Sequence, residues 1–294
     1  MNVTGSEIHS QPAVWRRALS DDSLIEAARD MLAAPGERVL AIGCGTSWFV
    51  AEAYAALREG AGFGETDAAC ASEVTGTRAY DRVVVFSRSG TTTEVLEALG
   101  KLPQSVRRTA VVAVAGTPVA QRSDDVLVLD FADERSVVQT RFPTTVLAVV
   151  RTVLGEEWAV DADAALAADL PAQPADVDHV VFLGTGWTIG LAHEAALKVR
   201  EAAQAWSESY PAMDFRHGPM AVAGPRSLVW VFGPLPEGMA ETVAATGARL
   251  HHDGLDPLAG LVLAQRFAIA LAAHRGLNPD EPRLLTRSVI LART

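Results

Sequence analysis

The chain has 294 residues, 49% of them hydrophobic, and a formal net charge of −11. This composition predicts one large or two ordinary compact domains and excludes a disordered or fibrous protein. Basic residues occur singly or in pairs, such as Arg16-Arg17 and Arg107-Arg108, so no cationic stripe could neutralise a phosphate backbone. We therefore expect no nucleic-acid partner.

Cys44 and Cys70 are the two cysteines, and neither a CxxC spacing nor a histidine cluster accompanies them. This predicts no disulfide framework and no metal site, and it fits a cytoplasmic protein. The first 20 residues have no apolar core of a signal peptide. The apolar segment 257–274 contains Gln265 and Arg266 and falls short of the ~20 clean residues of a membrane span, so we expect a buried helix and no membrane partner.

In the first half, short apolar runs alternate with helical segments. Strands are predicted at 38–43, 81–87, 109–116 and 125–131, and helices at 47–59, 91–102 and 140–156. This alternation is typical of βαβ units, and the nearly continuous apolar strands indicate a parallel sheet covered on both faces. The predicted class is α/β.

The pattern pauses near 155–165 in an Ala-, Pro- and acid-rich stretch, and a second series then begins. We expect two domains, 1–160 and 161–294. Residues 39–59 resemble residues 180–201, and 83–99 have a weaker counterpart in 228–244, which indicates a duplication. The second copy has little room for strands before its last helix, so its sheet is expected to be reduced.

Two strand-to-helix turns of the first half carry hydroxyls. The stretch "SRSGTTT" (87–93) contains Ser87, Ser89 and Thr92, and "GCGTS" (43–47) contains Gly45, Thr46 and Ser47. Backbone amides at a helix N-terminus form an anion site, and hydroxyls and a glycine complete it. The alternative is helix capping, which explains one or two hydroxyls per turn. Neither a P-loop nor the dinucleotide glycine spacing is present, so a nucleotide is not favoured.

An acid–base cluster is predicted in 195–222, interpreted as a helix that runs into a loop. Lys198 and Glu201 share one helix face, and the loop supplies His217. Spacing alone also fits a solvated ion pair on the helix surface. A carboxylate and a histidine are nonetheless the minimum for moving a proton between adjacent carbons of a sugar.

These segments, read together, resemble the sugar isomerase (SIS) domain family, above all the isomerase half of glucosamine-6-phosphate synthase and related deaminases and deglycases. The matching segments span nearly the whole chain: "SEIHSQP" (6–12), "GCGTS" (43–47), "ASE" (71–73), "SRSGTTTE" (87–94), "ERSVVQTRFPTT" (134–145), "ALKVRE" (196–201), "SESYPAMDFRHGP" (207–219) and "PRLLTRSV" (282–289).

The resemblance implies two flavodoxin-like αβα SIS subdomains, a homodimer with a shared active site, and a sugar-phosphate substrate bound without metal or cofactor. It assigns the phosphate to Gly45, Thr46, Ser47, Ser87, Ser89 and Thr92, with Arg88 adjacent. Glu201 would move the proton between C1 and C2, Lys198 would order the sugar, and His217 would open the ring, in the site of the partner subunit.

The sequence departs from the synthase pattern at two arginines and in its extent. Arg287 stands where the synthase has a lysine, so no Schiff base is expected there, and Arg287 would bind an anionic or hydroxyl group. Arg88 replaces a glutamine, as in deaminase-like members. This chain has no glutaminase segment, so glutamine-dependent synthesis is not expected of it alone. Deglycase activity, isomerisation of a sulfonated sugar and non-catalytic sensing remain alternatives.

Overall fold

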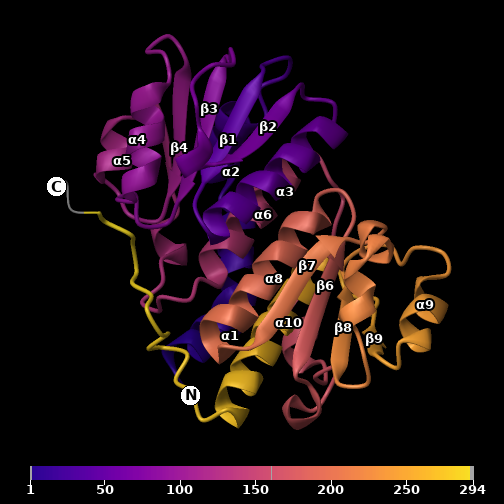
Figure 1. Ribbon diagram of the computed structural model, residues 1–294. Coiled ribbons are helices and arrows are strands. Elements are labelled where there is room, and N and C mark those ends of the chain that lie inside the picture. The colour runs from indigo at the N-terminus through magenta and orange to yellow at the C-terminus, as the bar shows by residue number, and fades with distance from the viewer. Residues whose placement is uncertain (1, 160, 292–294) are drawn as a thin grey trace. The chain divides into compact units, whose positions relative to one another are not determined.

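The structure is a computed structural model that describes residues 2–159 and 161–291. The chain divides into two compact units, each built around one sheet (Figure 1). The first-sheet unit comprises Ala13–Arg135, Arg141–Trp158 and Thr286–Thr294. The second-sheet unit comprises Met1–Pro12, Ser136–Thr140 and Ala159–Leu285. The N-terminal segment is thus grouped with the second sheet, and the C-terminal segment is grouped with the first sheet.

The first-sheet unit contains a five-stranded parallel sheet in the order β2-β1-β3-β4-β5, which is the flavodoxin order. Its strands are β1 (Val39–Gly43), β2 (Thr66–Cys70), β3 (Arg82–Ser87), β4 (Arg107–Val112) and β5 (Asp125–Val128). Its helices are α2 (Asp22–Leu32), α3 (Thr46–Gly60), α4 (Thr93–Lys101), α5 (Pro118–Gln121) and α6 (Arg141–Val153). The predicted α/β class is confirmed.

Side chains alternate between the two faces of this sheet. Val83 and Val85 of β3 pack with Val95 and Leu99 of α4 on one face. Phe86 points to the opposite face and meets Tyr54 of α3 edge to face, with ring centroids 5.5 Å apart. Burial on both faces is what the continuous apolar strands predict.

The second-sheet unit has four parallel strands in the order β7-β6-β8-β9. The strands are β6 (His179–Gly184), β7 (Trp206–Pro211), β8 (Ser227–Val231) and β9 (Arg249–His251). The helices are α7 (Ala162–Ala167), α8 (Thr188–Ala203), α9 (Met239–Ala245) and α10 (Pro257–His274), and α1 (Val3–Leu19) begins in this unit. With one strand fewer than the first, this sheet is reduced, as the sequence predicts.

Helix α10 is the buried helix expected at 257–274. Among the described residues it is the one helix long and apolar enough to cross a membrane by length and composition, and 67% of it is buried in the structure. Its polar Gln265 is buried, accepts a hydrogen bond from Gln11 at 2.7 Å and donates one to the carbonyl of Thr140 at 3.2 Å. A buried amide that is bonded in this way is compatible with a core helix.

No strand was predicted at β2, β7 or β9, which lie at edges of the two sheets. β2 begins with Thr66 and Asp67, β7 is largely polar and β9 has three residues, so none of them offers a continuous apolar run. The interpretation of 195–222 as helix followed by loop was therefore wrong in one respect. Helix α8 ends at Ala203, Gln204 adopts a left-handed φ of 49°, and β7 follows.

Candidate functional site

The two hydroxyl-bearing turns follow β1 and β3, which are neighbours in the first sheet. The residues before the two helices, Gly45 and Thr92, make no side-chain capping bond to α3 or α4. In the second turn, the hydroxyls of Ser87 and Ser89 accept the amides of Gly90 and Thr91 at 3.2 and 3.3 Å, so these two hydroxyls also hold the turn itself. Parallel strands place both turns at the carboxyl edge of the sheet, where open α/β folds bind ligands.

Gly90 is the residue that gives the second turn its shape. Its φ is +64°, and a Cβ at this position would lie 2.0 Å from Oγ1 of Thr117. Its amide donates to the Ser87 hydroxyl at 3.2 Å, and its carbonyl accepts the amide of Val119 at 3.0 Å. Glycine is required here for both its conformation and its size.

The predicted phosphate ligands all lie in the first-sheet unit. Thr46, Ser47 and Ser87 are buried, with 3%, 6% and 3% of their surfaces exposed, whereas Ser89 and Thr92 are half-buried. Gly45 is exposed, with φ 55° and ψ −127°, and directly precedes helix α3. The structure thus gathers Gly45, Thr46 and Ser47 on one turn and Ser87, Ser89 and Thr92 on the adjacent one.

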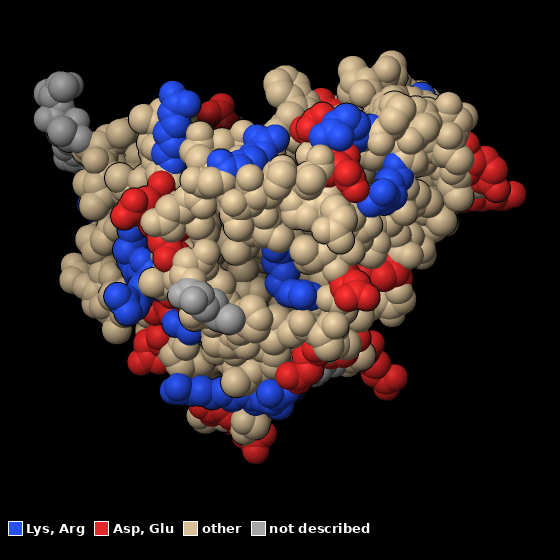
Figure 2. Space-filling view, turned by 90° about the horizontal axis from the view of Figure 1, so that it is seen from below, with Lys and Arg blue, Asp and Glu red and all other residues tan. Residues whose placement is uncertain are grey.

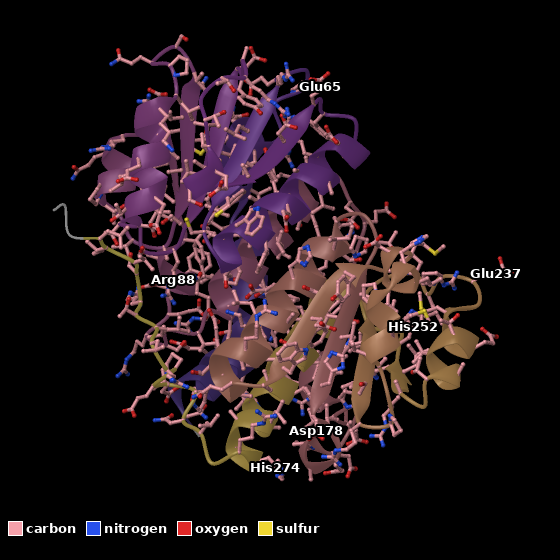
Figure 3. The ribbon with its side chains drawn as sticks, viewed as in Figure 1. Glu65, Arg88, Asp178, Glu237, His252 and His274 are labelled. Carbon is pink, nitrogen blue, oxygen red and sulfur yellow. The ribbon has the colours of Figure 1, made fainter. Side chains whose placement is uncertain are left out.

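Arg88 is directed away from solvent. Its side chain is buried, its Nη1 lies 3.9 Å from Oε2 of Glu134, and its Nη2 donates to the carbonyl of Arg287 at 3.0 Å. Figure 3 labels Arg88 where the C-terminal segment passes the first-sheet unit. The guanidinium therefore holds the C-terminal segment as well as lying next to the predicted phosphate turn.

The C-terminal segment 286–291 crosses the turn between β3 and α4. The Ser288 hydroxyl lies 3.1 Å from that of Ser89 and 2.9 Å from that of Thr91. The amide of Thr93, first residue of α4, donates to the Val289 carbonyl at 3.2 Å. One donor of the helix N-terminus is thus bonded to this segment.

Arg287, predicted to bind an anionic or hydroxyl group, has a protein partner in the structure. Its Nη2 bonds both carboxylate oxygens of Asp133, at 2.5 and 2.8 Å, and its Nη1 donates to the carbonyl of Glu134. Its side chain remains 37% exposed. The ion pair fixes the segment to the loop after β5.

The acid–base residues lie on α8 in the second-sheet unit. Nζ of Lys198 is 2.5 Å from Oε2 of Glu201 and 3.2 Å from Oε1 of Glu194. The Lys198 side chain is 1% exposed and that of Glu201 17%. Burial alone would lower the pKa of Lys198, but Glu194 and Glu201 outweigh it and raise the pKa above its usual value. The alternative of a solvated surface pair is therefore wrong.

Glu194 is the member of this cluster that the sequence analysis missed. It precedes Lys198 by one helical turn and is itself buried. The i, i+4 spacing within "EAALK" was the available signal. A buried lysine requires such charge compensation.

His217, the third predicted catalytic residue, lies on a short 3-10 turn, Asp214–His217, in the second-sheet unit. It is exposed. The described side chains give it no contact with Lys198 or Glu201, so the structure brings together two of the three predicted catalytic residues.

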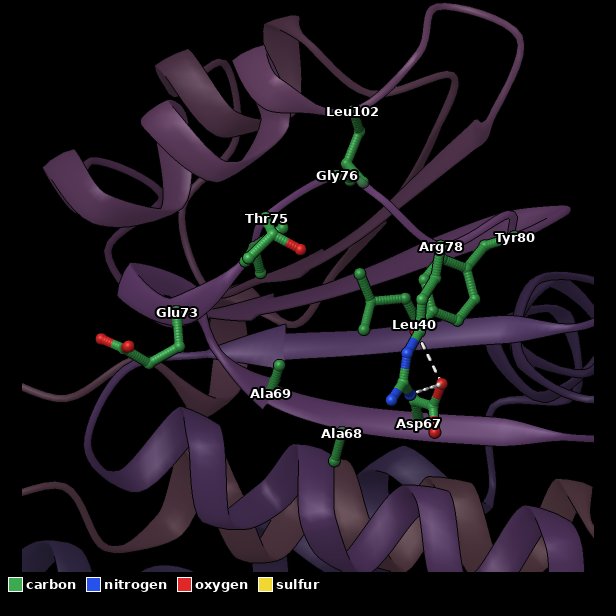
Figure 4. A pocket seen from close by; sticks show the side chains of 11 residues that line it. Leu40, Asp67, Ala68, Ala69, Glu73, Thr75, Gly76, Arg78, Tyr80 and Leu102 are labelled. Atoms are coloured by element: carbon green, nitrogen blue, oxygen red, sulfur yellow. Dashed lines mark hydrogen bonds and ion pairs between the residues drawn. The ribbon is translucent and has the colours of Figure 1, made fainter.

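A separate pocket of about 260 Å³ opens at the edge of the first sheet (Figure 4). Leu40 and Ala69 form part of its wall, and Asp67 accepts hydrogen bonds from Arg78 at 3.0 Å and Tyr80 at 2.6 Å. Because Asp67 is bonded to these two groups, its charge is compensated within the pocket wall. No predicted site residue lines this pocket.

Charged side chains are mixed on the face that Figure 2 presents. Blue basic and red acidic side chains alternate over it, without a broad basic area among the residues drawn in colour.

No family model matches the chain. It is 25% identical to a glutamine–fructose-6-phosphate aminotransferase (isomerizing) of Methanothermobacter thermautotrophicus, over 96% of this chain and 56% of the relative. It is 28% identical to the Pseudomonas putida enzyme of the same name, over 96% and 58%. The chain thus spans somewhat more than half the length of these curated relatives.

Two solved structures share the fold along the whole chain. A glucosamine-6-phosphate deaminase from Thermotoga maritima superposes with a TM-score of 0.85 at 24% identity, over 99% of this chain and 100% of that one. A tagatose-6-phosphate ketose/aldose isomerase from Escherichia coli gives a TM-score of 0.77 at 22% identity, over 100% and 97%. The two-sheet architecture is therefore that of these proteins.

Proposed function

We propose that this chain, which belongs to the sugar isomerase (SIS) domain family, catalyses an aldose–ketose isomerisation of a hexose or hexosamine 6-phosphate, with loss of ammonia if the sugar carries an amine. The names of its relatives support this class, since they are sugar-phosphate aminotransferases of the isomerizing type. Deglycase action on a phosphorylated sugar–amine adduct belongs to the same proposal, because it uses the same proton transfer.

The observation that carries the proposal is the buried charge cluster on α8. A lysine that is 1% exposed and held between two carboxylates is costly to build, so a fold retains it where it has a use. Glu201 is the member that keeps part of its side chain exposed. We assign it the proton transfer between C1 and C2 through an enediol or enolamine.

Lys198 positions this base. Its ammonium bonds Oε2 of Glu201 and is fixed in turn by Glu194, so the carboxylate is held in one orientation. A base whose orientation is fixed before substrate arrives avoids an ordering cost in the transition state. We therefore assign Lys198 and Glu194 as positioning residues.

The two hydroxyl turns supply the proposed phosphate site. The turns that precede α3 and α4, with the hydroxyls of Ser47, Ser87, Ser89 and Thr92, supply the proposed donors for a dianion. Binding energy at the phosphate is remote from the reacting carbons and can be used to orient them. His217, exposed on its own turn, is assigned to ring opening, and we propose that it serves the site of a second copy in a homodimer.

The experiment is proton NMR in D₂O with fructose 6-phosphate, glucosamine 6-phosphate and tagatose 6-phosphate, following exchange at C1 and C2 together with ammonia release. Exchange is expected for at least one sugar. In Glu201→Gln it should fall by about 10²–10⁴ while binding is retained, because the amide cannot accept the proton. Ammonia release would identify a deaminase.

The matched control is Glu241→Gln on exposed α9, which should exchange at the wild-type rate. Undiminished exchange in Glu201→Gln would overturn the assignment of the base. Binding of a sugar phosphate without exchange in the wild type would favour a non-catalytic sensor over the enzyme.

A further inference from the structure

We propose that Cys44 and Cys70 are a modification site: their thiols form a reversible intramolecular disulfide when the protein meets a low-molecular-weight disulfide. These are the two cysteines of the chain, and both are free and partly exposed. Formation of the disulfide is independent of the proposed function. The predicted effect of the disulfide on ligand binding rests on the proposed function.

Strand register brings the two cysteines together. In the parallel pair β1–β2, Gly43 is the register partner of Cys70, and Cys44 is the residue that directly follows the end of β1. Neighbouring strands are ~4.8 Å apart and one residue advances ~3.3 Å, which places the two Cα atoms about 6 Å apart. Disulfides span Cα separations of about 4.4–6.8 Å, so this spacing needs no large backbone movement.

The Cys44 thiol lies near that of Cys70, which raises its pKa, and near the backbone N–H of Ala71, which lowers it. Cys70 Sγ lies 3.3 Å from the hydroxyl of Ser72. Cys70 is the last residue of β2 and directly precedes the 3-10 helix Ala71–Glu73, so the chain turns immediately after it.

The Cys44 thiol is a poor attacking group. Burial, and then the neighbouring Cys70 and Glu94, raise the pKa of Cys44 to about 12, so its thiolate is scarce at neutral pH. We therefore assign Cys70 as the attacking thiol and Cys44 as the resolving one. The two cysteines therefore react in a fixed order, and the external disulfide reacts first with Cys70 of β2.

The reaction is two thiol–disulfide exchanges. The Cys70 thiolate attacks one sulfur of RSSR, forming a Cys70–S–S–R mixed disulfide and releasing RS⁻. The Cys44 thiolate then attacks the Cys70 sulfur and releases the second RS⁻. The two thiol protons end on the two released thiolates, so two protein thiols and RSSR give one protein disulfide and two RSH.

The disulfide should act on the phosphate turn. Cys44 directly precedes Gly45, whose φ of 55° and ψ of −127° set the start of α3. Closing the sulfurs to ~2.05 Å draws Cys44 toward β2 and shifts the amides that follow it. We expect the affinity for fructose 6-phosphate to fall at least threefold in the oxidised protein.

The test treats the full chain with oxidised glutathione at pH 8 and reads the products by intact mass and peptide mapping. The wild type should lose two hydrogens and keep no glutathione. Cys44→Ser should stop as a glutathione adduct at Cys70, and Cys70→Ser should remain unmodified at Cys44. A stable glutathione adduct in the wild type, adducts at both cysteines, or no reaction would each overturn the proposal.

A second pair of variants tests the assigned order. Glu94→Gln removes a negative charge near Cys44 and should speed loss of glutathione from the mixed disulfide, whereas Glu97→Gln on the exposed side of α4 should not. Equal rates in both variants would overturn the role of Cys44 as the resolving thiol.

Titration of oxidised and reduced protein with fructose 6-phosphate separates the two proposals. Equal affinity in both states would overturn the predicted effect on the turn. Absence of binding in both states, with the disulfide formed, would count against the proposed function and leave the disulfide established.

Discussion

The first strand-to-helix turn of each sheet is built on the same template. In β1–α3, a Cβ on Gly43 would lie 2.4 Å from the carbonyl oxygen of Ser47. In β6–α8, a Cβ on Gly184 would lie 2.2 Å from the carbonyl oxygen of Thr188. Both glycines therefore let the helix start directly against the end of its strand, and they align Ser47 with Thr188.

The aligned hydroxyls are used differently. Thr188 Oγ1 accepts the amide of Thr185 at 2.8 Å and lies 3.0 and 3.1 Å from the carbonyls of Thr185 and Phe232. Ser47 Oγ makes no such bond to another described residue, although its backbone is buried in the same way. The turn is thus kept in both units, with its hydroxyl bonded within the turn at Thr188 and without such a bond at Ser47 among the described residues.

The largest effects should come from filling the two glycine contacts. Gly43→Ala and Gly184→Ala each force a Cβ against helix backbone and should each lower the free energy of unfolding by about 1–3 kcal/mol. Urea unfolding measures this. Gly43→Ala should in addition lose sugar-phosphate affinity, whereas Gly184→Ala should keep it.

Gly60→Ala provides the control, because a Cβ there meets nothing within 4 Å. Its stability should equal or exceed that of the wild type. Equal loss of affinity in the Gly43 and Gly184 variants would show that the two turns are not divided into a ligand-binding and a structural one.

The next largest effects should come from removing the hydroxyls of Ser47 and Thr188 one at a time. Ser47→Ala should weaken sugar-phosphate binding about tenfold, since a hydrogen bond to a charged group contributes about 1.5 kcal/mol, with little change in stability. Thr188→Val should cost about 1–2 kcal/mol of stability by leaving the Thr185 amide unbonded, at unchanged affinity. Calorimetric titration measures the affinity and urea unfolding the stability of both variants. Loss of stability in Ser47→Ala together with loss of affinity in Thr188→Val would refute the prediction.

Part of the fold and of the candidate site could be predicted from the sequence. Apolar runs and the β1/β6 similarity were sufficient for the α/β class, the duplication and the reduced second sheet, because buried parallel strands are continuous in sequence. The edge strands β2 and β7 lack that signal. Pairing of Lys198 with Glu201 followed from helical spacing, but its burial depends on how α8 packs, which spacing does not record.

The turns after β3 and β8, the third strand of each sheet in chain order, differ as well. Ser288 bonds Ser89 and Thr91 on the first, whereas the turn after β8, 232–238, carries no hydroxyl side chain. Ser288→Ala should remove about 1 kcal/mol of local stability and raise amide exchange at Thr93 about fivefold. Thr242→Ala on α9 of the second-sheet unit is the control, and unchanged exchange at Thr93 in Ser288→Ala would show that Ser288 does not hold this segment.

The smallest effects concern a matched pair of titratable groups. Glu52 on α3 aligns with His193 on α8 when Gly43 is set against Gly184. Burial raises the pKa of Glu52 to about 7, and burial followed by Arg200 lowers the pKa of His193. Both groups therefore favour their neutral forms, but their effects on stability run in opposite directions with pH.

For Glu52, the folded state holds a proton that the unfolded state releases between pH 4.5 and 7, so this group makes stability fall as pH rises through that range. For His193, the unfolded state takes up a proton below pH 6.5 that the folded state refuses, so this group makes stability fall as pH drops below 6.5. Glu52→Gln should flatten the first slope by about 1 kcal/mol once solvent screening is allowed for. His193→Gln should flatten the second, and urea unfolding at pH 5, 6 and 7.5 measures both. If the two substitutions changed the pH dependence of stability in the same direction, burial would not govern this pair. The surroundings that α3 and α8 provide for the two groups would then not be equivalent.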